Sequence, residues 1–135
     1  MTESKLRNLS VEFSVKIIQL CESIKGHYSL TNQLERSGTS IGANIHEANY
    51  AQSKNDFISK LQIALKECYE TEYWLELFVK SELLDRDVAK NIYIDCVTIR
   101  KTLPSSTNTD KQNINKQTKN CHFCDSFFLA IFDRT

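Results

Sequence analysis

The segment Lys54–Leu83 carries an unbroken helical pattern, and this pattern limits the fold more than any other feature of the chain. One face repeats every four or three residues, at Phe57, Leu61, Ala64, Cys68, Thr71, Leu75 and Phe78. Such spacing predicts one α-helix with a single buried face. At 1.5 Å per residue the helix would be about 45 Å long. The sustained alternation of four and three suits the left-handed packing of helix bundles.

Three further segments show the same kind of spacing. The first runs from about Lys5 to Lys25, with Gly26 as a plausible stop, and has the stripe Leu6, Leu9, Phe13, Ile17, Leu20 and Ile24. The second ends near Tyr50 and has the stripe Leu34, Gly38, Ile41, Ile45 and Ala48. The last of them, which is the fourth helix along the chain, follows "LLDRD" and has the stripe Val88, Ile92, Cys96, Ile99 and Leu103. Four helices with short connections favour antiparallel neighbours.

Candidate caps mark where these helices begin. Ser29 or Asn32 can cap the second helix, and Asp85 or Asp87 the fourth. Ser53 with Asp56 three residues later resembles a capping box at the start of the third. We therefore predict an all-α protein, a left-handed up-down-up-down four-helix bundle over residues 1–103.

Residues 104–135 are predicted to form a linker and a short apolar tail. The run "PSSTNTDKQNINKQTKN" is polar, and its composition favours partial disorder. The tail gathers large apolar side chains at Phe127, Phe128, Leu129, Ile131 and Phe132. These side chains could dock on the bundle, contact a partner or be an appended end, and the sequence does not choose between the three.

The overall composition excludes some broad classes of protein. The 135 residues include 17 Lys plus Arg and 17 Asp plus Glu, so the chain lacks the basic excess of a dedicated nucleic-acid binder. A local basic patch is still compatible with that balance. No signal peptide or membrane-spanning run is visible. The cysteine count is odd, at five, which suggests reduced thiols and a cytoplasmic location.

The stretch "RSGTSIGANIHEA" combines a helical stripe with residues that weaken helices. A glycine costs about 1 kcal/mol relative to alanine inside a helix. Gly38 and Gly42 are four residues apart and share one face. Close approach of a second helix, from the same chain or from a neighbouring subunit, can offset that cost. We assign close helix packing to Gly38, Gly42, Ser37, Ser40 and Asn44. The stretch lacks the pattern of a phosphate-binding loop.

Two long motifs carry a resemblance to a known family. "QLERSGTSIGANIHEA" followed by "AQSKNDFISKLQIALKECYETEYWLEL" resembles the bacterial 23S ribosomal RNA intervening-sequence proteins. The resemblance implies a left-handed four-helix bundle that assembles as a ring-like homopentamer. A related branch, the accessory variability proteins of diversity-generating retroelements, partners a reverse transcriptase and binds nucleic acid. That branch is basic, whereas this chain is neutral.

Several charged residues fall within the matched motifs. We assign Glu47, Lys60, Glu67 and Glu70 to a buried or interfacial polar network, with a solvated face as the alternative. A di-metal site in a bundle needs a Glu-x-x-His pair on two helices, and neither helix of the motif has one. Cys121 and Cys124 form a lone C-x-x-C, which leaves one chain at least one ligand short of structural zinc, although clustering across subunits could supply more. We therefore predict no metal site and no cofactor.

The nucleic-acid alternative depends on basic residues along the helices. The candidates for contact are Lys5, Arg7, Lys16, Arg36, Lys54, Lys60 and Lys66. Lysines on helices are usually solvated, so the assignment comes from the resemblance rather than from the residues. The aromatic group of Tyr69, Tyr73 and Trp74 fits an interface or the core equally well.

The functional prediction is a non-catalytic, homo-oligomeric bundle that acts as an interaction scaffold, and the resemblance implies that it is a pentamer. No nucleophile, base and orienting group show the spacing of a catalytic triad, so no enzyme activity and no small-molecule substrate are assigned. The alternatives are an accessory factor that binds RNA, associated with ribosomal RNA insertions or a reverse transcriptase, and, less favoured, a metal-dependent bundle enzyme.

Overall fold

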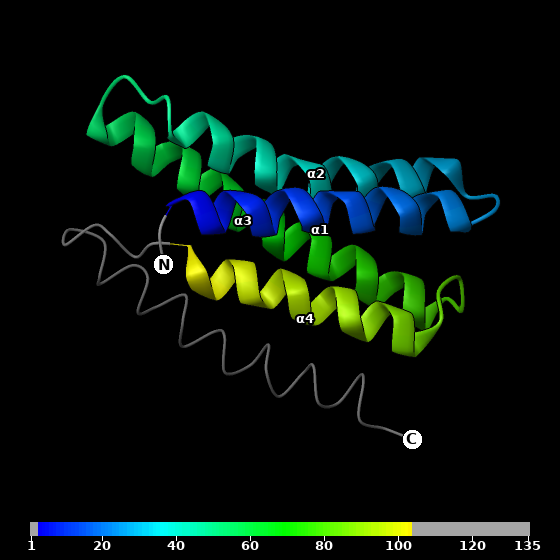
Figure 1. The fold of residues 1–135 in the computed structure, drawn as a ribbon. Helices are drawn as coiled ribbons and strands as arrows, with labels where there is room; N and C mark the ends of the chain where they lie inside the picture. The colour runs from blue at the N-terminus through cyan, green and yellow to red at the C-terminus, as the bar shows by residue number, and fades with distance from the viewer. Residues whose placement is uncertain (1–2, 104–135) are drawn as a thin grey trace. The chain divides into compact units, whose positions relative to one another are not determined.

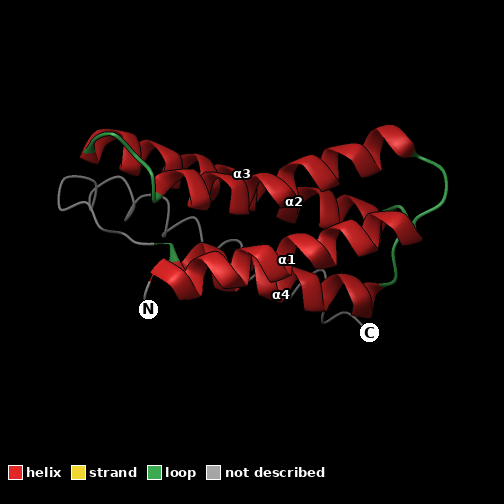
Figure 2. Ribbon diagram, turned by 45° about the horizontal axis from the view of Figure 1, so that its top comes forward, coloured by secondary structure: helices red, strands yellow, loops and turns green. Residues whose placement is uncertain are grey.

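The computed structural model describes residues 3–103, which form four α-helices joined by short loops (Figure 1). These are α1 (Glu3–Ser23), α2 (Tyr28–Ala48), α3 (Lys54–Lys80) and α4 (Arg86–Thr102). Consecutive helices pack against each other, and α4 also packs against α1, which closes the bundle. The loops lie at alternating ends, so neighbouring helices are antiparallel (Figure 2). The predicted all-α four-helix bundle is confirmed. The expected linker, apolar tail and Cys121–Cys124 pair lie outside the described residues.

The turn between α1 and α2 differs from the prediction. Gly26 and His27 both have left-handed backbone, with φ of 75° and 51°. These two residues reverse the chain, so α1 ends at Ser23 and α2 begins at Tyr28. His27 is the N-cap, and its side chain makes no capping hydrogen bond. The predicted caps Ser29 and Asn32 were wrong because both residues already lie inside the helix.

The starts of α3 and α4 follow the predicted capping chemistry. The Ser53 hydroxyl accepts a hydrogen bond of 3.1 Å from the Asp56 backbone N–H. The Asp56 carboxylate accepts from the N–H of Gln52 at 3.3 Å, one residue before the position that a capping box uses. The Asp85 carboxylate accepts from the N–H groups of Asp87 and Val88, at 2.9 and 3.2 Å. Both helices therefore have their first donors satisfied by a side chain.

The end of α3 was predicted three residues too late. The helix stops at Lys80, and Glu82 takes left-handed backbone with φ of 60°. The N–H groups of Leu83 and Leu84 both donate to the Phe78 carbonyl, at 2.9 and 3.3 Å. These hydrogen bonds satisfy the Phe78 carbonyl near the end of the helix, where the chain turns toward α4.

The core consists largely of the predicted stripes. The largest fully buried side chains include Phe13, Phe78, Ile17, Leu34 and Ile41. Val88 was placed in the stripe of α4 and is instead 45% exposed, whereas Ala89 is fully buried. Position 89 lies three residues before Ile92 and position 88 lies four before it, so either position can continue the buried face of α4. Within residues 3–103, no helix is both long and apolar enough to cross a membrane.

Candidate functional site

Gly38 and Gly42 lie on the side of α2 that packs against α1 of the same chain. A β-carbon built on Gly38 would stand 2.8 Å from Cγ2 of Ile17 and 2.9 Å from its Cγ1. One built on Gly42 would stand 3.3 Å from the Ser10 hydroxyl oxygen. Ser10 is fully buried, and its hydroxyl donates to the carbonyl of Arg7 at 2.7 Å. Small residues on both helices thus bring the α1 and α2 backbones close together.

The other small residues of the stretch do not share that contact. Ser37 is fully buried on the α3 side, where its hydroxyl oxygen accepts from Thr71 at 3.0 Å. The Ser40 hydroxyl donates to the Arg36 carbonyl at 2.6 Å. The Asn44 amide donates to the Ser40 carbonyl at 2.8 Å. The stretch therefore faces two neighbouring helices, with glycines toward α1 and Ser37 toward α3.

A charged cluster joins α2 to α3 beside Ser37, and we call it the Arg36 cluster. Its members are Arg36, Glu67, Glu70 and Trp74. The Arg36 guanidinium lies 3.4 Å from both carboxylate oxygens of Glu67 and donates a second, short hydrogen bond to Glu70. The Trp74 indole N–H donates to the same Glu70 oxygen at 3.2 Å.

The two carboxylates of the Arg36 cluster have different protonation behaviour. The hydrogen bond from Arg36 lowers the pKa of Glu70 below its ordinary value. Burial raises the pKa of Glu67, and this effect outweighs the attraction of Arg36. Both carboxylates belong to α3 and both bind Arg36 of α2, so they hold these two helices together.

Glu47 and Lys60 form a separate ion pair. The Lys60 ammonium lies 2.8 Å from a carboxylate oxygen of Glu47, and this hydrogen bond raises the pKa of Lys60. Within residues 3–103, no hydrogen bond or ion pair links this pair to the Arg36 cluster. The four residues assigned to one polar network therefore lie as two groups, both between α2 and α3.

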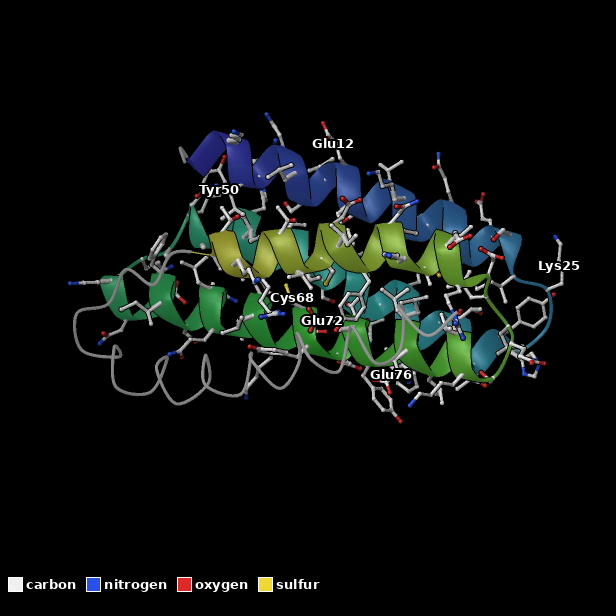
Figure 3. All side chains as sticks on the ribbon, turned by 90° about the horizontal axis from the view of Figure 1, so that it is seen from below. Glu12, Lys25, Tyr50, Cys68, Glu72 and Glu76 are labelled. Atoms are coloured by element: carbon white, nitrogen blue, oxygen red, sulfur yellow. The ribbon has the colours of Figure 1, made fainter. Side chains whose placement is uncertain are left out.

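The most buried ion pair within residues 3–103 joins α3 to α4, and no pattern in the sequence pointed to it. The Arg100 Nε donates to the Glu72 carboxylate at 2.9 Å, and their side chains are only 3% and 6% exposed. The Arg100 guanidinium also lies 4.9 Å from the centre of the Tyr69 ring. In Figure 3, Glu72 lies between the helices, whereas Glu12 points outward. No local signal marks Arg100, because a charge near the end of a helix usually indicates a solvated residue.

Cys68 and Cys96 lie next to each other in the core, close to this pair. The Cys96 thiol donates to the Cys68 carbonyl at 3.5 Å, and both residues are fully buried. The hydrogen bond to Cys68 and burial raise the pKa of Cys96 well above its ordinary value. Both are free thiols, and such thiols behave as small core residues.

The residues suggested for nucleic-acid contact are partly engaged within the bundle. Arg36 and Lys60 are paired as described, and Lys16 lies 2.8 Å from the Asp95 carboxylate. The Arg7 Nε donates to the His46 ring at 3.3 Å. The remaining candidates are exposed and lack an ion pair within residues 3–103, at Lys5, Lys54 and Lys66. In the same range, no group of three or more His, Cys, Asp and Glu side chains is placed to hold a metal ion.

An apolar groove runs along the outside of α1 and α2. It has a volume of about 310 Å³. Its lining consists of Arg7, Val11, Ser14, Val15, Ile18, Gly42, Ala43 and His46. Three of these are exposed aliphatic side chains on α1, with exposed fractions of 48% for Val11, 47% for Val15 and 38% for Ile18. The absence of long side chains at Gly42 and Ala43 makes the recess beside them.

Comparisons with known proteins add a family and one solved structure. A family model described as 23S rRNA-intervening sequence protein matches residues 2–105. A crystal structure of a protein with unknown function, from the S23 ribosomal protein family of Bacteroides thetaiotaomicron, is 45% identical in sequence. The match has a TM-score of 0.72 and covers 76% of this chain and 95% of that chain. No curated protein matches the chain.

Proposed function

The chain belongs to the family of 23S rRNA-intervening sequence proteins, and on that premise we propose that it is a non-catalytic protein that self-assembles and serves as an interaction scaffold. The observation that carries this proposal is a set of large apolar side chains that the single bundle leaves exposed. On α1, α3 and α4 these are Val11, Val15, Ile18, Ile63, Tyr73, Val88 and Ile94. Exposed apolar patches on a folded domain mark interaction surfaces.

The charged residues support a non-catalytic role. In the Arg36 cluster and in the Glu72–Arg100 pair, each carboxylate meets a cation of a neighbouring helix. These contacts hold helices together, and a reaction centre would instead aim such groups at a shared cavity. The free thiols at Cys21, Cys68 and Cys96 also fit a reducing compartment, so we place the protein in the cytoplasm.

The resemblance implies five copies in a ring, and we propose that arrangement for this chain. A ring needs two different contact faces on each copy, because each face meets the other face of the next copy. Two helices offer such faces. On α3, Ile63 and Tyr73 are exposed, and on α4, Val88 and Ile94 are exposed. We propose that these two faces form the contact between neighbouring copies.

Size-exclusion chromatography with light scattering tests the proposal. We expect the full chain to elute as an assembly whose mass is about five times 15.6 kDa. Ile94→Lys should reduce that mass, because it places a charge in the contact. Gln33→Lys adds the same charge at an exposed polar position of α2, outside both proposed faces, and should leave the mass unchanged. A wild-type protein that stays a single chain at all concentrations would refute self-assembly.

The same chromatogram tests the RNA alternative, which involves ribosomal RNA insertions or a reverse transcriptase as partner. Co-eluting nucleic acid would raise the absorbance at 260 nm relative to 280 nm and would be lost in high salt, because phosphate contacts release counterions. The ion pairs of Lys16, Arg36 and Lys60 make these residues less available for such contacts. We therefore expect a clean assembly without nucleic acid.

A further inference from the structure

The outer face of α1 carries an apolar stripe that the packing of the bundle does not use. We define the α1 stripe as Arg7, Val11, Val15, Ile18 and Glu22. Their spacing of four or three residues places them on one face of the helix. The three aliphatic members are exposed in the single bundle. The contact proposed above between neighbouring copies uses α3 and α4, so the α1 stripe stays open on every copy of the ring.

The groove beside the α1 stripe has the form that a helix from another protein would fill. One wall consists of the aliphatic side chains of α1, and Gly42 and Ala43 of α2 leave a recess next to them. A helix that lays its apolar face into a groove makes its contacts through residues spaced at i, i+4 and i+7. Val11, Val15 and Ile18 have this same spacing, so they can pack along such a face over its whole length.

The ends of the α1 stripe carry opposite charges. Arg7 and Glu22 are about 22 Å apart along the axis, at 1.5 Å per residue. Both side chains are exposed, and within residues 3–103 neither forms an ion pair. Arg7 uses its Nε to reach His46 at 3.3 Å, so four further N–H donors of its guanidinium can meet a carboxylate. The stripe therefore specifies a charge for each end of the helix that it binds.

We propose that the α1 stripe docks a single amphipathic helix of a partner protein. This inference rests on the scaffold function proposed above and names the kind of partner that the scaffold holds. The partner helix places an acidic residue against Arg7, a basic residue against Glu22 and aliphatic side chains between them. Helices favour acidic residues in the first turn and basic residues in the last, because of the macrodipole. A helix with this charge order lies parallel to α1.

The forces in this contact have different roles. The aliphatic side chains and the recess at Gly42 supply apolar burial, which gives the affinity. The two end pairs are exposed to solvent, so they mainly select the partner and fix its direction. One groove offers a small contact. A ring that repeats the groove on every copy binds a partner with several such helices more tightly than one copy does.

A designed peptide tests the docking site on the full chain. The probe is a labelled helix of about 20 residues, long enough to be helical. It has a glutamate, three leucines and a lysine at the same spacing as the α1 stripe. Fluorescence anisotropy measures its dissociation constant. Val15→Glu should weaken binding by roughly 100-fold, because it buries a carboxylate among the leucines. Failure of the wild-type chain to bind this peptide saturably would overturn the proposal.

Gln33→Glu is the matched control for an added carboxylate. Gln33 is exposed and lies nine residues from Gly42, which places it on the opposite side of α2. Peptide binding should be unchanged in this variant. Circular dichroism should show wild-type helix content and melting for both variants, because Val15 is exposed in the single bundle.

Charge exchange tests the end pair at Arg7. Arg7→Glu places a carboxylate opposite the glutamate of the peptide and should weaken binding by about tenfold. A second peptide, with lysine in place of that glutamate, should bind Arg7→Glu as tightly as the first peptide binds the wild type. Weak binding of both peptides to Arg7→Glu would refute the charge complementarity on which the choice of partner depends.

Light scattering on the same variants separates this inference from self-assembly. Val15→Glu should lose the peptide and keep the wild-type mass, whereas Ile94→Lys should lose mass and keep the peptide. A mass that falls in Val15→Glu would show that a second copy covers the α1 stripe, and it would overturn the partner helix. A wild-type protein that stays a single chain and still binds the peptide would refute self-assembly and support the docking site.

Discussion

Gly38 of α2 lies so close to Ile17 of α1 that a β-carbon on Gly38 would stand 2.8 Å from a methyl carbon of Ile17. Such a distance is shorter than real β-carbon contacts. Ile17 is fully buried, so its side chain has little room to move away. The glycine costs about 1 kcal/mol of helix propensity. Close packing of the two backbones offsets this cost through dispersion contacts along the interface.

We expect Gly38→Ala to destabilise the bundle by about 1–3 kcal/mol, because the added methyl group overpacks the α1–α2 contact. Gly42→Ala is the matched control. Its β-carbon would meet Ser10 at 3.3 Å, a smaller intrusion, and the gain of about 1 kcal/mol in helix propensity should offset it. Urea unfolding of both variants gives the two free energies. Equal stability of Gly38→Ala and the wild type would contradict the packing role of Gly38.

The Arg100–Glu72 pair should be intolerant of losing one partner. Arg100→Met leaves the Glu72 carboxylate buried without its cation, and we expect a loss of about 3–5 kcal/mol in the free energy of unfolding. Replacing both residues, with Arg100→Met and Glu72→Leu, should recover most of the loss because no charge is left in the core. Thermal melting of the single and double variants makes the comparison. A single variant as stable as the wild type would contradict the buried ion pair.

Stability in acid should depend on Glu70. Its pKa is lowered in the folded state by the hydrogen bond from Arg36. The stabilisation that ionised Glu70 gives the folded protein is therefore fully present at pH values above the pKa of Glu70 in the unfolded chain. It is lost as the pH falls through the lower pKa of Glu70 in the folded protein. Glu67 has the opposite sign: its raised folded pKa makes protonation favour the folded state, so it offsets part of the loss.

Glu70→Gln should remove the acid-dependent part of the Glu70 contribution. We expect the variant to be less stable than the wild type at neutral pH by about 1 kcal/mol or less, because solvent screens the partly exposed cluster. The difference should shrink toward zero as the pH falls below the ordinary range of a glutamate. Urea unfolding at a series of pH values measures it. A constant difference across the series would show that Glu70 acts through packing rather than charge.

The sequence predicted the features that depend on neighbours along the chain. The periodic stripes gave the four helices and most of the core, and Ser53 and Asp85 cap their helices as predicted. The errors arose where periodicity is ambiguous or where the backbone turns. Positions 88 and 89 fit the α4 stripe equally well, and the left-handed pair at Gly26 and His27 started α2 before its predicted caps.

The side-chain contacts between helices could not be predicted in the same way. Whether Arg100 meets Glu72 depends on how α3 and α4 are rotated and shifted against each other, and no local pattern encodes that relation. The same holds for Arg36, which the sequence suggested as a nucleic-acid contact and which lies against Glu67 and Glu70. The groove beside Gly42 also requires two helices to be placed before it exists.

Native mass spectrometry of the full chain shows whether this bundle works as an assembly of copies. We expect a dominant species that contains several chains of 15.6 kDa and persists on dilution to concentrations at which nonspecific clusters separate. A spectrum that contains only the single chain, at every concentration where the protein is folded, would contradict it.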